Sequence, residues 1–377
     1  MSMIRKITIL ENTIFSTNTA RLTLTQVLID KGYHITILST GNDKDMATAR
    51  NKGFKVIDVG SSNTNIFDVF GYMRNLRREL KKSKPDVCLT FSIRPAIWGN
   101  MVTRLLKIPT ITNISGIGPL AESETLPYKV ARLLYKFVLK KTARVFFQNP
   151  DDRNVFLTKK FVQQHKTEII PGSGVDYEYY KPIPKKRIDE KFVFLFISRL
   201  IKDKGILEYV EAAKGIKLLR TDVEFQVLGP YYSQNLKENI ITEKQIVQWV
   251  EQGVVNYLGA TNDVRPFIAE CDCVVLPSYR EGMSNVLLEA GSMQKPCITS
   301  NTTGCSDIVI DGLTGYLCRV KDAADLQAQM IKMADLPKDN RTQMGIEARE
   351  IMKKKFAKQL VEDAYLSAID AILKNRN

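Results

Sequence analysis

The sequence predicts an α/β protein built from two doubly wound parallel sheets that face each other across a cleft. Three observations lead to this prediction. Short apolar runs rich in Val, Ile and Phe alternate with segments of helical period along the chain, which is typical of right-handed βαβ units. The alternation pauses once, near the middle, and then restarts. A chain of 377 residues is also long enough for two domains of ordinary size.

The first half of the chain contains a set of expected strands separated by expected helices. The strands are Ile4–Leu10, His34–Ser39, Lys55–Val59, Asp86–Phe91, Thr110–Ile114 and Arg144–Gln148. The helices between them are Ala20–Lys31, Phe67–Lys82, Ala96–Leu106 and Tyr128–Lys140. Such helices cover both faces of a parallel sheet.

The pattern pauses between Gly172 and Glu190, where glycine and proline breaks, tyrosines and a basic trio occur. We interpret residues 176–190 as an interdomain linker. The alternation then resumes with strands at Phe192–Ser198, Glu224–Gly229, Val254–Gly259, Cys273–Ser278, Pro296–Ser300 and Gly315–Val320. The chain ends in a helical tail from Arg341 to Lys374.

These breaks define the expected domains. The N-terminal domain covers residues 1–175 and the second domain covers residues 191–355. Residues 356–377 form a C-terminal helix that we expect to pack back on the N-terminal domain. Ligands of doubly wound sheets bind beyond the carboxyl ends of the strands, so the loops after strands are the places to look for function.

Composition excludes several classes of protein. Hydrophobic residues make up 44% and charged residues 25%, which is typical of a globular chain and excludes a mostly disordered one. No apolar run reaches the length of a membrane span, and the apolar stretch Ile7–Leu10 is too short for a secretory signal. The six cysteines form no CxxC pair, so we expect reduced thiols in a cytoplasmic protein.

The positive charge is confined to one half of the chain. The formal net charge is +14, with +16 in residues 1–187 and −2 in residues 188–377. A basic half attracts a polyanion, an anionic membrane or a phosphorylated substrate, and charge alone does not choose among them.

The first segment that could carry chemistry runs from Leu276 to Ala290. An apolar strand leads into a polar loop with Gly282, and a helix opens near Ser284 or Asn285, both good N-cap residues. Unpaired N–H groups at such a helix start form a phosphate site. Glu281 lies on the loop and Glu289 on the helix. From spacing alone, an exposed loop acid and a surface helix acid are equally compatible with this pattern.

The second segment, Phe196 to Gly205, also follows a strand and precedes a helix. Arg199 and Lys204 could reach a common anion, the guanidinium as a planar fork and the ammonium as a point charge. They could also be solvated cations at a helix start. Cations in that position oppose the helix dipole unless an anion lies nearby, which favours a functional role.

Together these segments resemble the retaining nucleotide-sugar glycosyltransferases of family 4, which have two facing Rossmann-like domains. The likeness covers nearly the whole chain and is densest from Phe192 to Leu317. The motifs that carry it are Ser198-Arg199, Lys204-Gly205, Val255-Asn256-Tyr257-Leu258-Gly259, Leu276-Pro277-Ser278, Glu281-x7-Glu289 and Asp311-Gly312-x-Thr314-Gly315.

The resemblance implies roles for individual residues. Arg199 and Lys204 would hold the donor diphosphate and, with Glu281 on the hydroxyls of the transferred sugar, would form the catalytic set. Glu289 would accept hydrogen bonds from the ribose. The implied donor-binding residues are Ser198, Gly229, Leu258, Gly282, Met283, Ser284, Asn285 and Glu289.

The resemblance also implies that no metal and no cofactor is required. Leaving-group charge would be met by Arg199, Lys204 and helix N–H groups in place of a bound cation. Asp43 and Asp45 have the spacing of a metal-binding pair, but they lie in a polar segment that we interpret as a solvated loop.

Two features depart from the family pattern. Residues 11–18 follow the first strand without a glycine, so backbone binding of phosphate there is not expected, although Asn18 and Arg21 could enter the cleft. A cleft histidine is also missing, because His34 and His165 are badly placed. Ser115 and Gly116, on a loop after a strand, are the candidate acceptor contacts.

Within the family, the likeness is greatest to bacterial transferases that extend sugars linked to polyprenyl diphosphate, including N-acetylgalactosaminyltransferases. The resemblance therefore implies a UDP-sugar donor, retaining transfer of an N-acetylhexosamine and a lipid-linked saccharide acceptor. Such an enzyme works as a peripheral protein at the inner face of the cell membrane.

A basic, partly apolar helix in the first half suits that location. Its cations are Lys129, Arg132, Lys136, Lys140 and Lys141, interleaved with Val130, Leu133, Leu134, Phe137 and Val138. Mixed basic and apolar residues on one helix favour docking on an anionic membrane surface. The alternative is that the apolar residues face the core. Nucleic-acid binding is not expected, because no recognised motif or stacking pattern of aromatics accompanies the charge.

Two other functions are compatible with this fold. A nucleotide-sugar 2-epimerase would require several cleft carboxylates and a histidine near the leaving diphosphate. A non-catalytic membrane- or polyanion-binding protein would not need Arg199, Lys204, Glu281 and Glu289 together.

Overall fold

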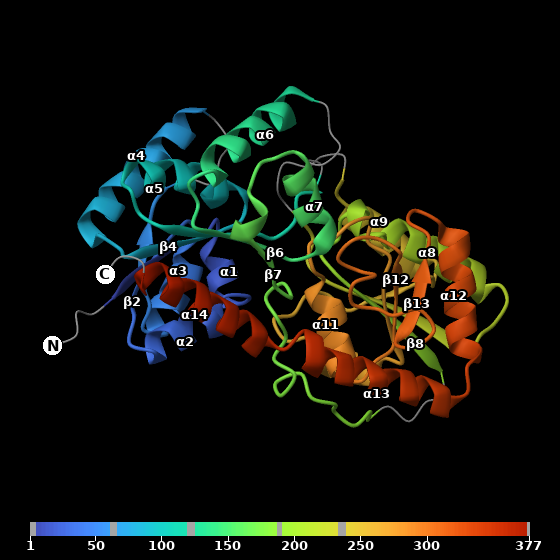
Figure 1. The fold of residues 1–377 in the computed structure, drawn as a ribbon. Coiled ribbons are helices and arrows are strands. Elements are labelled where there is room, and N and C mark those ends of the chain that lie inside the picture. The colour runs from blue at the N-terminus through green and yellow to red at the C-terminus, as the bar shows by residue number, and fades with distance from the viewer. Residues whose placement is uncertain (1–4, 61–65, 119–124, 187–190, 233–238, 375–377) are drawn as a thin grey trace. The chain divides into compact units, whose positions relative to one another are not determined.

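The computed structural model describes residues 5–60, 66–118, 125–186, 191–232 and 239–374 (Figure 1). The chain divides into two compact units. The first contains Met1–Ser173 and Gln359–Asn377, and the second contains Gly174–Lys358. Residues 174–186, which the sequence places at a domain end and in a linker, belong to the second unit.

The first unit is built on a seven-stranded parallel sheet in the order β3-β2-β1-β4-β5-β6-β7. The strands are β1 (Lys6–Leu10), β2 (His34–Ser39), β3 (Lys55–Asp58), β4 (Val87–Phe91), β5 (Thr110–Ile114), β6 (Arg144–Phe147) and β7 (Thr167–Ile169). The chain winds outward from β1 to β3 and then crosses to β4 on the other side of β1. The carboxyl ends of β1 and β4 therefore flank the point where the winding reverses, where such sheets bind ligands.

Helices cover both faces of this sheet (Figure 1). They are α1 (Ile14–Asn18), α2 (Leu22–Asp30), α3 (Asp43–Asn51), α4 (Ile66–Ser83), a π-helical turn (Pro95–Gly99), α5 (Asn100–Leu105), α6 (Leu126–Leu139), α7 (Pro150–Thr158), a 3₁₀ turn (Gln164–Lys166) and α14 (Lys358–Lys374). The helix α14 packs into the core of this unit. Its buried Tyr365 and Ile369 join the same cluster as Ile9 and Phe91 of the sheet, because apolar residues recur along one face of the helix.

The second unit contains a six-stranded parallel sheet in the order β10-β9-β8-β11-β12-β13. Its strands are β8 (Phe192–Ile197), β9 (Val223–Leu228), β10 (Asn256–Tyr257), β11 (Cys273–Leu276), β12 (Cys297–Ser300) and β13 (Gly315–Cys318). Its helices are a 3₁₀ turn (Lys202–Lys204), α8 (Ile206–Lys217), α9 (Glu243–Glu251), α10 (Arg265–Glu270), α11 (Asn285–Ser292), α12 (Ala323–Asp335) and α13 (Lys338–Lys355). All six residues of β8 are buried, as expected for a central strand covered on both faces.

The two doubly wound parallel sheets confirm the predicted fold class. Two local predictions are wrong. Asp43 and Asp45 lie in the first turn of α3, where Asn42 caps the helix by accepting from the Asp45 N–H, and acidic residues there favour the helix dipole. The predicted tail is two helices, α13 and α14, because the chain leaves the helical path at Phe356 and Ala357 to pair with Val175.

All six cysteines are buried and unpaired. Cys88, Cys273, Cys297 and Cys318 lie on strands, and burial raises their thiol pKa values. Among the described residues, no helix combines the length and apolar character needed to cross a bilayer.

Candidate active site

The predicted donor-site residues gather at the carboxyl edge of the second sheet. In its strand order the winding reverses between β8 and β11, which pair directly with Val274 opposite Leu195. The loop after β8 carries Arg199 and Lys204, and the loop after β11 carries Glu281. The two segments singled out in the sequence therefore flank the reversal point, where open α/β sheets bind ligands.

The structure joins these two loops by an ion pair between Lys204 and Glu281. The Lys204 ammonium donates a hydrogen bond to Glu281 Oε1. Both side chains are largely shielded, with 16% and 13% of their surface exposed. A charge pair in such a site is screened much less than a pair on the open surface, so the attraction between Lys204 and Glu281 holds the two loops together.

Backbone contacts fix the geometry around this pair. The Tyr279 N–H and the Ser278 hydroxyl both donate to the Asp203 carbonyl, at 2.9 and 3.1 Å. The Glu281 N–H donates to the Thr303 carbonyl at 3.1 Å, so the segment after β12 supports the other side of the loop. The loop that carries Glu281 is thus held between the segment after β8 and the segment after β12.

Two glycines make this close packing possible. Gly205 has φ +75°, and a Cβ there would lie 2.1 Å from the Pro277 carbonyl oxygen. Gly304 has φ +76°, and its Cβ would lie 2.5 Å from the Glu281 carbonyl oxygen. Left-handed backbone strains other residues, and here a side chain would also push the loops apart.

The start of α11 lies directly after Glu281 and the loop residues Gly282 and Met283. Ser284 occupies the N-cap position and Asn285 begins the helix, as the sequence predicts, but the Ser284 side chain makes no capping hydrogen bond. The first N–H groups of a helix have no partner within the helix. The structure leaves those of α11 without a side-chain cap, beside the Lys204–Glu281 pair.

Arg199 lies on the same loop as Lys204 but does not share its contact. Its guanidinium stacks over the Tyr232 ring, 5.0 Å from the ring centroid. Within the described part of the chain, Arg199 is exposed and is not hydrogen-bonded to Glu281. The structure thus brings Lys204 and Glu281 together. It leaves Arg199 exposed at the edge of the candidate site, which we call its rim.

Glu289 lies on α11, within the same unit. The Tyr180 hydroxyl donates to Glu289 Oε1 at 3.1 Å. Burial of the Glu289 carboxyl raises its pKa to about 7, the Tyr180 hydrogen bond lowers it and the nearby Asp263 raises it. A carboxyl with this pKa exchanges its proton near neutral pH.

Tyr180 is a residue of this site that the sequence interpretation missed. It lies in the segment interpreted as a linker, and its proximity to Glu289, 109 residues later, has no local signature. The tyrosine run Tyr177, Tyr179 and Tyr180 is the only hint in the sequence, because several aromatic residues are unusual in a flexible linker.

The remaining donor-site candidates line the carboxyl ends of β8, β9 and β10. The Ser198 N–H donates to Leu228, the Gly229 N–H to Gly259 and the Leu258 N–H to Val227, at 3.1, 2.8 and 2.9 Å. These residues continue the backbone hydrogen bonding of the sheet beyond the strand ends. They therefore lie along the same carboxyl edge as Glu281, on the side of β8 opposite β11.

Arg21 and Asn18, which the sequence analysis proposed for the acceptor side of the cleft, contact residues of the first unit. Arg21 is buried against the Phe91 ring at 4.5 Å, donates to the Ser173 hydroxyl and lies 3.9 Å from Glu11. The Asn18 amide donates to the Asp45 carbonyl at 2.9 Å. Ser115 and Gly116 are exposed.

Glu11 is a second residue that the sequence interpretation missed. It follows β1 directly, is 1% exposed and accepts from the Ser92 hydroxyl at 2.8 Å. Burial raises its pKa, while Arg21 lowers it. Its place after the first strand, where the family pattern has glycine, is the feature that could have drawn attention to it.

The predicted docking helix, α6, divides its apolar residues between two faces. Val138 and Leu139 are buried in the core of the unit. Leu126, Leu133 and Phe137 are exposed to 73%, 68% and 51%. The alternative that all the apolar residues face the core is therefore wrong for Leu133 and Phe137.

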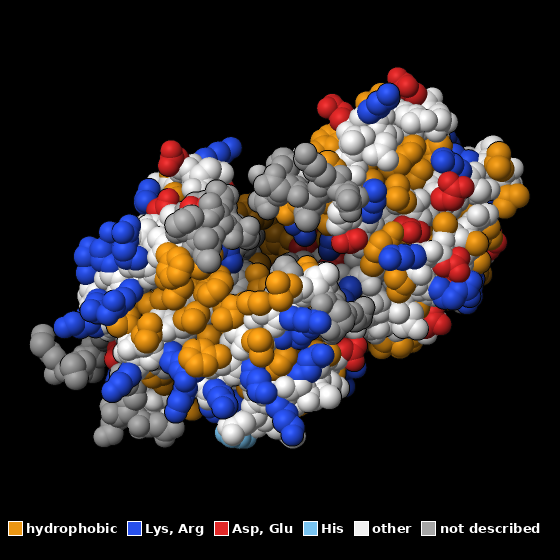
Figure 2. Space-filling model, turned by 90° about the horizontal axis from the view of Figure 1, so that it is seen from above, with side chains coloured by type: hydrophobic (Ala, Val, Ile, Leu, Met, Phe, Trp, Pro, Cys, Tyr) orange, Lys and Arg blue, Asp and Glu red, His pale blue; other side chains and the backbone are white. Residues whose placement is uncertain are grey.

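The cations of α6 accompany this exposed apolar face. Lys129, Lys136, Lys140 and Lys141 are exposed and Arg132 is half-buried. Figure 2 views this side of the first unit and shows hydrophobic side chains gathered on it, with Lys and Arg side chains around them. We call the set Leu126, Val130, Leu133 and Phe137, together with these five cations, the α6 surface.

Within the described ranges, no three His, Cys, Asp or Glu side chains converge as a metal site would require.

The fold consists of two doubly wound α/β units, and sequence comparison identifies the family to which the chain belongs. Residues 181–351 match the family described as glycosyl transferases group 1, and residues 6–149 match the glycosyl transferase 4-like family. The chain belongs to these glycosyltransferases.

Two bacterial relatives carry specific names. The chain is 31% identical over 278 residues, 69% of each chain, to an Escherichia coli UDP-Gal:alpha-D-GlcNAc-diphosphoundecaprenol alpha-1,3-galactosyltransferase. It is 24% identical over 376 residues, 94% of this chain and 96% of the other, to an N,N'-diacetylbacillosaminyl-diphospho-undecaprenol alpha-1,3-N-acetylgalactosaminyltransferase of Campylobacter jejuni. These matches give no support to an epimerase or a non-catalytic protein.

Solved structures share the fold. A glycosyltransferase from Rickettsia africae superposes with a TM-score of 0.80 at 18% identity, covering 99% of this chain and 100% of the other. The Anabaena protein HepE, solved in complex with UDP and glucose, superposes with a TM-score of 0.79 at 17% identity, covering 97% of this chain and 100% of the other.

Proposed function

We propose that this glycosyltransferase moves an N-acetylhexosamine from a UDP-sugar to a polyprenyl-diphosphate-linked saccharide during assembly of a bacterial surface glycan. The names of the Escherichia coli and Campylobacter jejuni relatives support this substrate pair, since both act on undecaprenol-diphosphate-linked sugars. The product keeps the anomeric configuration of the donor, as the resemblance to retaining enzymes implies.

The observation that carries the proposal is the Lys204–Glu281 pair beside the uncapped start of α11. The donor diphosphate lies against Lys204 and the helix N–H groups, with Arg199 moving from the rim onto a phosphate oxygen. These groups stabilise the charge that develops on the leaving diphosphate. Transfer therefore needs no metal ion and no cofactor.

Glu281 and Glu289 then hold the two sugars of the donor. Glu281 is paired with Lys204 through Oε1, and its carboxylate oxygens accept hydrogen bonds from hydroxyls of the transferred sugar. Glu289 accepts hydrogen bonds from the ribose, sharing or replacing the one it receives from Tyr180. The carboxyl ends of β9 and β10, with Gly229 and Leu258, lie near the base.

The lipid-linked acceptor requires the enzyme to work at a membrane, and the α6 surface supplies the means. Exposed Leu133 and Phe137 enter the interfacial region of the bilayer, while Lys136, Lys140 and Lys141 attract anionic lipid headgroups. The enzyme is therefore peripheral, at the cytoplasmic leaflet.

The substrate assignment is tested with a panel of nucleotide sugars and a polyprenyl-diphosphate-linked N-acetylhexosamine as acceptor, by measuring product mass. We expect one UDP-N-acetylhexosamine to add a single N-acetylhexosamine, with added chelator leaving the rate unchanged. Transfer from GDP-sugars alone, or to soluble saccharides but never to the lipid-linked one, would reject the assignment. Proton NMR of the product measures the anomeric configuration.

A further inference from the structure

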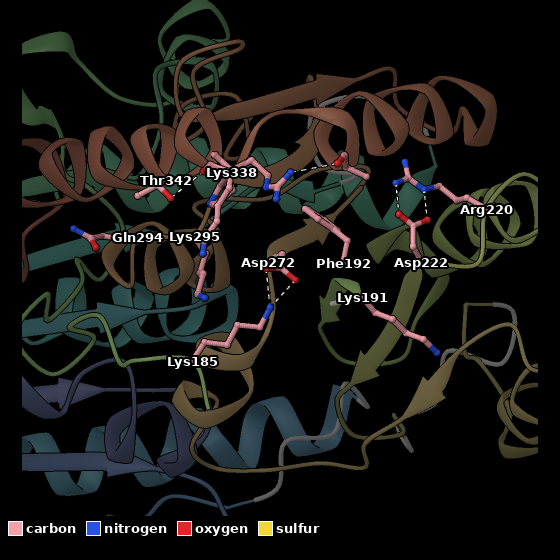
Figure 3. Close-up of a pocket in the computed structure, with 13 residues that line it drawn as sticks. Lys185, Lys191, Phe192, Arg220, Asp222, Asp272, Gln294, Lys295, Lys338 and Thr342 are labelled. Carbon is pink, nitrogen blue, oxygen red and sulfur yellow. Dashed lines mark hydrogen bonds and ion pairs between the residues drawn. The ribbon is translucent and has the colours of Figure 1, made fainter. Parts of the chain in front are cut away.

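A cavity lies at the opposite edge of the second sheet from the loops that carry Lys204 and Glu281. Its volume is about 630 Å³. Its floor is formed by residues that precede strands, including Phe192 at β8, Asp222 before β9 and Asp272 before β11 (Figure 3). One wall is the start of α13, with Lys338, Arg341 and Thr342. Because parallel strands all run the same way, this amino-terminal edge is separated from Lys204 and Glu281 by the length of the sheet.

Two of the cavity's cations are balanced by carboxylates. The Lys185 ammonium bonds both oxygens of Asp272, at 2.8 and 3.0 Å. The Arg220 guanidinium pairs with Asp222 at 2.7 Å and also with Asp335. Figure 3 shows the Lys185–Asp272 and Arg220–Asp222 pairs on separate sides of the cavity. These pairs account for both acidic residues that line it.

Three further cations have no carboxylate partner among the described residues. The Lys295 ammonium donates to two backbone carbonyls, of Ala269 and Cys271, both at 2.8 Å. Arg341 donates to backbone carbonyls and stacks over the Phe192 ring at 5.0 Å. Lys338 is exposed and makes no ion pair within the described part of the chain. Carbonyl oxygens satisfy donors without cancelling charge. The cavity is lined by six cations, Lys185, Lys191, Arg220, Lys295, Lys338 and Arg341, and by only two carboxylates, so its lining is positive.

The start of α13 adds to this positive potential. Its N-cap is Pro337, which makes no side-chain cap hydrogen bond. Lys338 and Arg341 lie in the first turn, where cations oppose the helix dipole. Asp339, in the same turn, is exposed and does not line the cavity. This concentration of like charge around a cavity is unfavourable unless an anion is bound there.

We propose that this cavity is a binding site for an organic phosphate or diphosphate, distinct from the donor site. Ammonium and guanidinium groups are the side chains that bind phosphate oxygens. The volume is within the range of small-molecule sites, about 300–1,000 Å³, so it admits a phosphate with an attached organic group. The phosphate comes either from a soluble metabolite or from a lipid headgroup.

The test uses the full chain with Arg199→Ala and Lys204→Ala, which remove both cations proposed to bind phosphate at the donor site. Calorimetric titration with inorganic pyrophosphate measures binding at the second site. In this background, Lys338→Glu is compared with Lys354→Glu, a charge-matched control on an exposed lysine at the other end of α13. Glutamate in a first helical turn favours the dipole, so Lys338→Glu is expected to fold, which thermal unfolding checks.

We expect pyrophosphate to bind with an affinity that falls as salt rises, weakened about tenfold by Lys338→Glu and by less than twofold in the control. A parallel arm measures binding to phosphatidylglycerol vesicles. Loss in that arm alone supports the site and assigns its phosphate to a lipid headgroup. Equal binding by the two variants in both arms, or no binding in either, overturns the proposal. Neither outcome depends on sugar transfer, so it leaves the proposed reaction separately testable.

Discussion

At the scale of single residues, two carboxyl groups of the candidate site have different surroundings. Glu281 is paired with Lys204. Glu289 is buried beside a tyrosine hydroxyl, and its pKa rises to about 7. The two acids lie eight positions apart in one loop and helix, yet Glu281 contacts a cation, whereas Glu289 is desolvated, which disfavours the charged form of its carboxyl.

Replacing Glu281 by Gln separates catalysis from donor binding. The amide keeps the shape of the side chain but loses the charge that accepts hydrogen bonds strongly, so we expect kcat to fall by roughly 10²–10³. Binding of UDP depends mainly on phosphate contacts and is expected to change by less than about tenfold. Steady-state rates and UDP titration measure the two effects. Unchanged transfer activity would remove Glu281 from the catalytic set.

The raised pKa of Glu289 predicts a pH dependence of donor binding. Below pH 7 the free carboxyl is mostly protonated, whereas ribose hydroxyls donate best to the carboxylate. Binding therefore releases a proton, and affinity for the UDP-sugar rises with pH up to about 7 and then levels off. Titration calorimetry between pH 5.5 and 8.5 measures it. The Glu289→Gln variant is the control, and a slope that persists in it would assign the effect to another group.

At the scale of elements, the donor site depends on loops that pack on one another without intervening side chains. Gly205 lies against Pro277, and Gly304 lies against Glu281. The contact between Lys204 and Glu281 is therefore set by backbone geometry as much as by the charged groups themselves, since a displacement of either loop would separate them.

Gly205→Ala tests this dependence. Its Cβ would overlap the Pro277 carbonyl at a positive φ, so we expect a loss of about 2–4 kcal/mol in the free energy of unfolding, measured by chemical denaturation. Gly253→Ala is the matched control, because Gly253 has φ +66° with nothing within 4 Å of the added Cβ. It should cost about 1 kcal/mol. Equal losses in the two variants would mean that the loop contact is not what constrains Gly205.

Much of this arrangement follows from local sequence patterns, and the remainder depends on long-range packing. The apolar runs locate β1 to β6 of the first sheet and β8 to β13 of the second, apart from errors at their ends, because buried parallel strands are continuously apolar. They do not include β7, which is three residues long and only partly buried. The loops that carry Lys204 and Glu281 can be located from the sequence, because each comes directly after a predicted strand. The contact between Tyr180 and Glu289 cannot be predicted in this way, because it joins residues far apart in the chain. The exposure of Leu133 cannot be predicted either, since helical period identifies an apolar face without saying what covers it.

At the scale of the whole molecule, the positive charge is concentrated in one half of the chain. Residues 188–377, which contain the proposed donor site, are nearly neutral, whereas the excess charge lies in the first 187 residues. Part of that excess is on the α6 surface, beside exposed apolar side chains. In the proposed docking, charge attracts the protein to an anionic bilayer and apolar insertion retains it there.

Charge reversal on α6 tests this account. The triple variant Lys136→Glu, Lys140→Glu and Lys141→Glu should bind phosphatidylglycerol vesicles at least about a hundredfold more weakly, given about 1 kcal/mol for each cation. Co-sedimentation at increasing salt measures it, and wild-type binding should fall steeply with salt. The control reverses Lys353, Lys354 and Lys355, outside the α6 surface. Salt-independent binding, or equal loss in the control, would contradict docking through α6.

The position of α14 has a consequence for the order in which the protein folds as it is synthesised. The first unit is made first, but its core needs Tyr365, Ile369 and Leu373, near the end of the chain. Each buried side chain of this kind stabilises the unit by about 1.5–3 kcal/mol. The second unit contains all its own strands and helices before residue 358. We therefore expect the second unit to reach its native state first. The first unit, although it is synthesised earlier, completes its core only when α14 has been synthesised.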